Sequence, residues 1–271
     1  MRVNLSLDHH GGNHELHKIL WGDAIRAKGF QFSPIDNCDV VIQWGVSYQN
    51  RLETNSRVLV LDFPYWNRGT KNNRNAGEYY KVSLNGQHPT PYIMKESHDS
   101  LRYHTSNGAE IKPWKEGGDY ILVAGMGVKA ANQNGYDVGE WEEKVIKIIK
   151  AQTDKTIIYR PKPNRKPRPI IGTVYDDGKI SIEEMVQNAY CVVCHHGNPT
   201  VAALQAGVPI FMNGTIGAAS HCASFDFNNI HNHKKPDNRE QFLYNLAHWQ
   251  FSIDEIRQGK VFDSFIERGL I

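Results

Sequence analysis

The sequence predicts an α/β protein with two domains, each built around a parallel, doubly wound sheet. Three observations support this prediction. Short apolar runs alternate with amphipathic stretches along most of the chain. The length of 271 residues is sufficient for two domains of about 120 and 150 residues. Residues 190–213 have the pattern of a strand, a tight loop, a helix and a second strand, and such a βαβ unit requires parallel strands.

The first third of the chain places carboxylates next to predicted strands. Strands are expected at residues 1–7, 40–42 and 57–62, with a helix at residues 14–28. Asp8 follows the first strand and Asp62 ends the third. Ligands of doubly wound sheets bind beyond the carboxyl ends of the strands, so we expect Asp8, the neighbouring histidines and Asp62 to converge there.

Residues 63–94 are rich in aromatic residues, Asn, Gly and Arg and have no helical period. Arg68 and Arg74 alternate with aromatic residues such as Tyr65 and Trp66. Basic groups among aromatic rings can hold a nucleic acid or a sugar acceptor through phosphate contacts and stacking. A long surface loop without a ligand is the alternative.

The second half of the chain repeats the α/β pattern after a polar linker at residues 97–118. Strands are predicted at residues 119–123, 156–159, 190–194 and 208–212, and helices at residues 138–150, 181–189, 237–246 and 253–257. Gly125 and Gly127 form a turn with room for a ligand after the first of these strands. Arg160 and Lys162 follow the second in a loop stiffened by proline, where both cations can face a phosphate.

The loop after residue 194 is a candidate anion site. His195 and His196 precede Gly197, which allows a ligand to approach the backbone closely. Asn198 is a favourable N-cap, Pro199 suits the first helical turn, and Thr200 adds a hydroxyl. Exposed N–H groups and the helix dipole favour an anion at such a helix start. An ordinary βα turn that binds nothing is the alternative.

Composition excludes few classes of function. The net charge of +2 is too small to indicate a polyanionic partner. The four cysteines are few and unevenly placed, and Cys191 and Cys194 lie on a predicted buried strand, so we expect small buried thiols rather than a zinc or redox site. No signal peptide or apolar run of membrane length is evident, which predicts a cytoplasmic protein.

The segment HHGNPTVAALQAGVPIF resembles the C-terminal-domain signature of GT-B glycosyltransferases, especially the branch related to capsule-polysaccharide transferases. Arg160-Pro-Lys162-Pro is similar to the Arg-Pro-His-Pro segment of that branch, with Lys162 in the His position. The resemblance implies two Rossmann-like domains with a ligand cleft between them. It implies boundaries at residues 1–115 and 116–252, with residues 253–271 packing back toward the first domain.

The resemblance also implies a nucleotide-sugar donor, with a UDP-sugar such as UDP-glucose as first choice, and no tightly bound cofactor. The implied donor-binding residues are Gly125, Gly127, Arg160, Lys162, His195, His196, Gly197, Asn198, Pro199 and Thr200. Asp62 is the first candidate for the base that deprotonates the acceptor hydroxyl, and Asp8 is the second. The sequence has no Asp-x-Asp segment, which is consistent with transfer that needs no metal.

For the acceptor, the short chain and its aromatic, basic segment resemble phage enzymes that glycosylate hydroxymethylated pyrimidines in DNA. The implied acceptor residues are Tyr65, Trp66, Arg68, Arg74 and Asn85. Double-stranded DNA would then be a partner, in the host cytoplasm, and the target base would have to be flipped out. A polysaccharide or small-molecule acceptor, a non-catalytic nucleotide or nucleic-acid binding module, and a sugar-nucleotide epimerase are the alternatives.

Overall fold

The computed structural model describes residues 1–7, 14–45, 56–67, 79–162 and 168–271. Asp8, Arg68 and Arg74 lie outside the described residues. The chain groups into two compact units. The first unit comprises Met1–Pro89, Ser100–Gly108 and Asn245–Ile271, and the second comprises Thr90–Asp99 and Ala109–Tyr244. Relative to the expected boundaries, the chain therefore returns to the first unit earlier, at Asn245.

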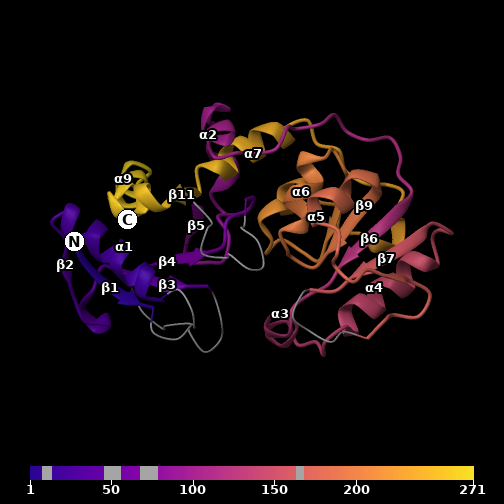
Figure 1. The fold of residues 1–271 in the computed structure, drawn as a ribbon, viewed down its shortest axis with the longest axis horizontal. Helices are drawn as coiled ribbons and strands as arrows, with labels where there is room; N and C mark the ends of the chain where they lie inside the picture. The colour runs from indigo at the N-terminus through magenta and orange to yellow at the C-terminus, as the bar shows by residue number, and fades with distance from the viewer. Residues whose placement is uncertain (8–13, 46–55, 68–78, 163–167) are drawn as a thin grey trace. The chain divides into compact units, whose positions relative to one another are not determined.

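The sheet of the first unit has six strands in the order β11-β5-β4-β3-β1-β2 (Figure 1). These strands are β1 (Arg2–Ser6), β2 (Gln31–Phe32), β3 (Val40–Trp44), β4 (Arg57–Asp62), β5 (Tyr79–Leu84) and β11 (Gln250–Ser252). The strands from β1 to β4 are paired in parallel. In contrast, β5 pairs antiparallel with both β4 and β11. The predicted parallel sheet is confirmed for four strands and wrong for this edge, where β5 and β11 were not expected.

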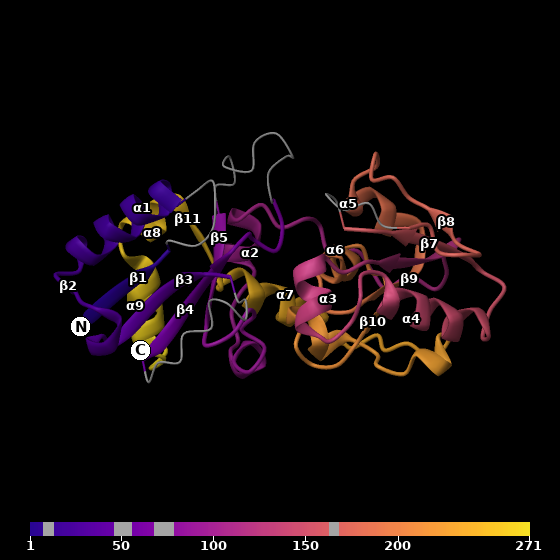
Figure 2. The ribbon, with the colours of Figure 1, turned by 90° about the horizontal axis from the view of Figure 1, so that it is seen from below.

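The described helices of the first unit come from three separate segments of the chain. They are α1 (His14–Ala27), α2 (Leu101–Thr105), α8 (Ile253–Arg257) and α9 (Lys260–Glu267). Figure 2 shows α8 and α9, in yellow, beside the indigo α1. The rings of Trp21 on α1 and Phe262 on α9 are fully buried and meet edge to face at 5.6 Å between centroids. The Arg102 guanidinium on α2 makes two hydrogen bonds to the Glu255 carboxylate on α8, at 2.7 and 3.0 Å.

The sheet of the second unit is entirely parallel across its five strands, in the order β10-β9-β6-β7-β8. These strands are β6 (Tyr120–Ala124), β7 (Thr156–Arg160), β8 (Val174–Tyr175), β9 (Ala189–Cys194) and β10 (Ile210–Met212). Its helices are α3 (Val128–Gln133), α4 (Glu140–Lys150), α5 (Ile182–Met185), α6 (Pro199–Gln205) and most of α7 (Arg239–Ala247). Short 3₁₀ turns lie at Ile35–Asn37, Ile93–Lys95, Val186–Asn188, Ala218–Cys222 and Phe227–Asn229.

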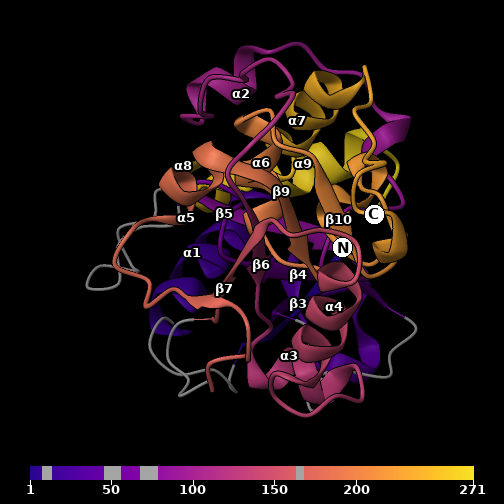
Figure 3. The same cartoon turned by 90° about the vertical axis from the view of Figure 1, so that its right-hand side faces the viewer.

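Helices α4 and α6 lie on opposite faces of the second sheet (Figure 3). On the α4 side, Trp141, Val145 and Ile149 pack against alternate residues of β6 and β9 such as Val123 and Val193. Burying side chains of this size contributes about 1.5–3 kcal/mol each. Because both faces are covered, the central strands are apolar on both sides, which explains the continuous run YCVVC in β9.

Gly118, just before β6, is required by a close approach of two backbones. A Cβ at Gly118 would stand 2.3 Å from the Tyr190 nitrogen and 2.4 Å from the Ala189 carbonyl carbon. We therefore expect Gly118→Ala to destabilise the protein by about 1–3 kcal/mol, because overpacked backbone must move apart. Gly117→Ala is the control, since a Cβ there meets nothing within 4 Å. Urea unfolding of both variants is monitored by Trp fluorescence. Equal midpoints for the two variants would contradict this packing.

Candidate functional site

Three loops of the second unit leave the sheet at the same level. Ala124, the last residue of β6, lies opposite Arg160 on β7 and Cys194 on β9. The loops that follow contain Gly125 and Gly127, Lys162, and the residues from His195 to Thr200. The predicted donor-binding residues therefore gather at the carboxyl edge of adjacent parallel strands, where α/β sheets bind ligands.

The two glycines after β6 allow the loop after β7 to pack directly against them. A Cβ at Gly125 would stand 3.3 Å from Cα of Pro161, and one at Gly127 would stand 2.9 Å from Cδ of Lys162. We expected the space at these glycines to receive a ligand. The structure shows that part of it is filled by the Lys162 side chain, which places an ammonium-bearing chain along the Gly127 backbone.

Arg160 forms an ion pair that the sequence did not predict. Its Nη1 lies 3.1 Å from Oδ2 of Asp176, and the two side chains are only 12% and 10% exposed. These two atoms do not have the alignment of a hydrogen bond, so the contact is an ion pair rather than a bidentate hydrogen-bonded pair. The guanidinium charge is thus already balanced within the protein. Of the two predicted cations of this loop, Arg160 is therefore the one that pairs with Asp176.

His195 and His196 form a hydrogen-bonded chain with Asn213. The Asn213 amide donates to Nε2 of His195 at 2.9 Å, and the Nδ1 atoms of the two imidazoles are 2.6 Å apart. Since Nε2 accepts, the His195 proton is on Nδ1 and is donated to His196. His195 is 2% exposed and packs edge-on to the Trp141 ring, and this burial lowers its pKa. With this assignment, the neutral His196 ring carries its proton on Nε2.

The start of α6 differs in detail from the prediction. Asn198 and Pro199 occupy the expected N-cap and first-turn positions, but the Asn198 side chain makes no capping bond. Thr200 is 1% exposed, and its hydroxyl donates to the Gly197 carbonyl at 2.8 Å. The Gly197 N–H donates to Sγ of Cys194 at 2.9 Å. The Thr200 hydroxyl is therefore a structural group here, and only residues 196–199 of this loop are partly exposed.

The Cys194 thiol has a structural role. Burial raises its pKa to about 11, so it stays protonated and accepts a weak bond from the backbone. All four cysteines are buried and unpaired, as expected for small apolar side chains.

In the first unit, Asp62 lies at the carboxyl end of β4 within a buried polar cluster. Its Oδ1 accepts the Phe63 N–H at 2.7 Å, and its Oδ2 accepts a hydrogen bond from the Gln87 amide. The Lys81 ammonium, on a side chain 2% exposed, lies 3.5 Å from Oδ2 and 3.3 Å from Nδ1 of His88. Sequence analysis did not identify Lys81, Gln87 or His88 as members of this cluster. Lys81 could have been found from the antiparallel pairing of β4 with β5, which places it opposite Asp62, but β5 was not predicted as a strand.

Tyr65 and Trp66 are core residues rather than exposed stacking groups. They are 4% and 6% exposed. The Tyr65 hydroxyl lies 3.3 Å from Nδ1 of His88, and the Trp66 indole N–H donates to the Ser106 carbonyl at 2.9 Å. Burial raises the pKa of Tyr65. The interpretation of these rings as an exposed platform for bases does not fit this placement.

Asn85, also expected to bind the acceptor, is a turn residue. Its φ is +54°, a conformation that Asn tolerates better than most residues. Its side-chain oxygen accepts the Val58 N–H at 2.8 Å, which closes the turn after β5.

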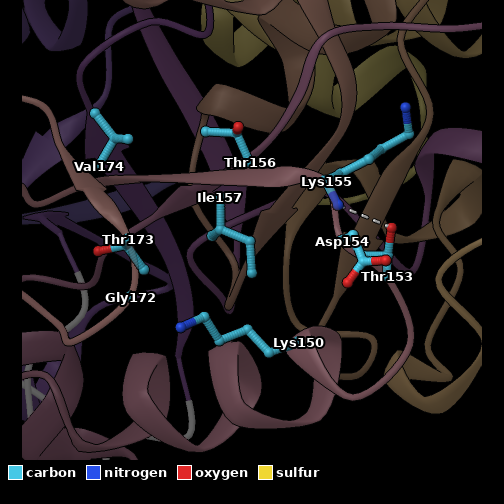
Figure 4. Close-up of a pocket in the computed structure, with 9 residues that line it drawn as sticks. All are labelled: Lys150, Thr153, Asp154, Lys155, Thr156, Ile157, Gly172, Thr173 and Val174. Carbon is cyan, nitrogen blue, oxygen red and sulfur yellow. Dashed lines mark hydrogen bonds between the residues drawn. The ribbon is translucent and has the colours of Figure 1, made fainter.

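A surface pocket lies at the other edge of the second sheet (Figure 4). It is lined by Lys150, Thr153, Asp154, Lys155, Thr156, Ile157, Gly172, Thr173 and Val174. Thr156 is the first residue of β7, so the pocket adjoins the amino end of that strand. Ligands of this fold class bind at the opposite, carboxyl end, and none of the predicted donor residues lines the pocket.

Within the part of the chain that is described, no helix is long and apolar enough to cross a bilayer.

The two units, with their predominantly parallel sheets, have the fold of GT-B glycosyltransferases. The beta Kdo 2,7 transferase KpsC from Thermosulfurimonas dismutans aligns with a TM-score of 0.59 and 13% identity, covering 97% of this chain and 100% of that chain. The beta Kdo 2,4 transferase of KpsC from the same organism aligns with a TM-score of 0.54 and 10% identity, covering 95% and 98%. No protein-family model and no curated protein sequence matches. The expected fold class is thereby confirmed.

Lys81 is expected to stabilise the first unit. Lys81→Met keeps most of the buried stem but leaves the 21%-exposed Asp62 carboxylate without its ammonium. The loss of a polar partner from a mostly buried carboxylate lowers the free energy of unfolding by about 1–3 kcal/mol. Lys28→Met is the matched control, because the Lys28–Asp263 pair is more exposed, at 25% and 44%, and exposed pairs contribute about 0–1 kcal/mol. Urea unfolding of both variants measures the difference, and a smaller loss for Lys81→Met would contradict a stabilising pair.

Proposed function

We propose that this protein is a glycosyltransferase that moves a sugar from a nucleotide-sugar donor to a hydroxyl group. The observation that carries the proposal is the group of three loops at one carboxyl edge of a GT-B fold. These loops contain the glycines after β6, the Lys162 ammonium and the imidazole pair. Such groups suit a phosphate-bearing ligand, because backbone amides and a cation both attract the leaving phosphate.

The donor belongs, in this proposal, to the second unit. Lys162 along Gly127 and the Nε2–H of His196 supply positive and hydrogen-bonding groups on two neighbouring loops. Arg160 acts indirectly, since its charge is balanced by Asp176 and its role is to hold the loop after β7. A UDP-sugar is the first donor to test, and GDP-, ADP- and CMP-sugars are the alternatives.

The base belongs to the first unit. Asp62 would accept the proton of the acceptor hydroxyl as its oxygen bonds to the anomeric carbon and the nucleotide leaves with the electron pair. Lys81 and Gln87 hold this carboxylate in place. Asp8 is the second candidate and lies outside the described residues.

A saccharide hydroxyl is the acceptor we favour. The buried Tyr65 and Trp66 rings do not provide the stacking surface that a flipped base needs. The two transferases named above act on Kdo according to their names, which suits a saccharide. Hydroxymethylated DNA is the second candidate and is decided by assay.

Donor binding is expected to raise the melting temperature. A ligand at 100 times its Kd stabilises the folded state by about 2.7 kcal/mol. Lys162→Gln should weaken this binding about 10- to 150-fold, because one ammonium–phosphate contact contributes about 1.5–3 kcal/mol. The control is Lys150→Gln, in the pocket at the other edge of the sheet. If UDP-, GDP-, ADP- and CMP-sugars all leave the melting temperature unchanged, a nucleotide-sugar function is refuted.

Asp62→Asn is expected to lose transfer while it keeps donor binding. Removal of a general base lowers the rate about 10²–10⁴-fold. Asp39→Asn is the control, because Asp39 precedes β3 at the opposite edge of the same sheet, where it pairs with Arg2 at 2.9 Å. Turnover is measured with a saccharide and, separately, with hydroxymethylated DNA. Unchanged function in Asp62→Asn would favour a binding module, and a modified sugar released without acceptor would favour an epimerase.

A further inference from the structure

Glu142 is a buried carboxyl group on α4 that reaches the glycine loop after β6. It is 1% exposed. Its Oε1 accepts the Met126 N–H at 2.5 Å and would lie 3.2 Å from a Cβ placed on Gly125. Met126, the middle residue of the Gly125–Gly127 loop, is therefore anchored by the side chain of Glu142, which is 16 residues away in sequence.

The second carboxyl oxygen of Glu142 is in an unusual situation. Oε2 is buried, and among the described residues no group donates a hydrogen bond to it. A carboxylate with one bare oxygen in an apolar setting is costly, whereas the neutral acid is much less so. Burial is the main reason that the pKa of Glu142 is raised above 4.5, and the neighbouring Glu143 adds to the increase.

Among the described residues, the side chains that shift the pKa of Glu142 include no cation. Tyr159 faces it from β7 and Cys194 from β9, and both have pKa values raised chiefly by burial, with the Glu142 charge contributing. On α4 itself, Glu143 has the same sign of charge. Lys162, on the adjacent loop, lowers the pKa of Cys194.

We propose that Glu142 is a positioning residue of the nucleotide site, which supports the Gly125–Gly127 loop and must be protonated when an anionic ligand occupies that loop. The inference rests on the proposed function for the identity of the ligand, a nucleotide phosphate. An ionised Glu142 carboxylate, bonded to the Met126 N–H, would repel a phosphate bound at the same loop. At a pH above the pKa that Glu142 has in the ligand-free protein, binding of the phosphate is therefore accompanied by uptake of one proton at Glu142.

The experiment compares Glu142→Gln, Glu142→Leu and the control Glu143→Gln, with UDP as the probe. Glutamine keeps an acceptor for the Met126 N–H and removes the charge, while leucine removes both. In the wild type and Glu143→Gln we expect UDP affinity, measured by calorimetry from pH 5.5 to 8.5, to fall by up to tenfold per pH unit once Glu142 ionises. Glu142→Gln should show only the smaller pH dependence that arises from the UDP phosphate and the imidazoles of the site, and Glu142→Leu should bind at least tenfold more weakly throughout. An equal decline in the wild type and in Glu142→Gln would overturn the proposal.

A readout without ligand separates this inference from the proposed function. A carboxyl whose pKa is raised on folding stabilises the protein below the unfolded value, near 4.5, and this contribution is lost as the pH rises through the folded pKa. The melting temperature of Glu142→Gln should therefore increase relative to the wild type as the pH rises from 5 to 8.5. If UDP binds no variant but this difference is present, the donor assignment fails and the protonated support stands. If the difference is absent, the inference about Glu142 fails whether or not UDP binds.

Discussion

The pairing of β6 with both β7 and β9 is the constraint on which the candidate donor site depends. Backbone hydrogen bonds set Ala124 level with Arg160 and with Cys194. Because side chains alternate along a strand, a slip of one residue would turn the α4-facing side chains toward the other face and stagger the loops. The apolar residues of β6 and β9 that pack on α4 thus fix the register, and the register in turn assembles the glycines, the lysine and the imidazoles.

Buried charge is handled in three different ways around the two sheets. Arg160 and Asp176 neutralise one another at the edge of the second sheet, which holds a loop but removes a cation from ligand binding. In the first unit, the buried Lys81 ammonium lies 3.5 Å from Oδ2 of Asp62 and 3.3 Å from Nδ1 of His88, so it has a carboxylate and an imidazole as neighbours. Oε1 of Glu142 accepts a backbone N–H, the described groups that shift its pKa include no cationic side chain, and burial favours its protonated form.

Local signals predicted much of the fold. Apolar runs rich in β-branched residues marked β4 and β9. Ser181 caps its short helix by accepting the Glu184 N–H at 3.1 Å, an interaction between residues three apart in the sequence. Strand β5 was missed because its lysine is buried against a carboxylate that lies on another strand. The same limit applies to Asp176 and Asn213, whose contacts depend on tertiary register. Composition could not distinguish the buried Tyr65 and Trp66 from surface aromatics, and the roles of the site residues remain predictions.

The division of the chain between the units has a consequence for synthesis on the ribosome. The second unit is nearly continuous in sequence, whereas the sheet of the first is completed by β11, and α8 and α9 cover it. Strand β5 and the ring of Trp21 have partners, β11 and Phe262, that follow the second unit in the sequence. The first unit can therefore be completed only after the whole of the second unit has been synthesised.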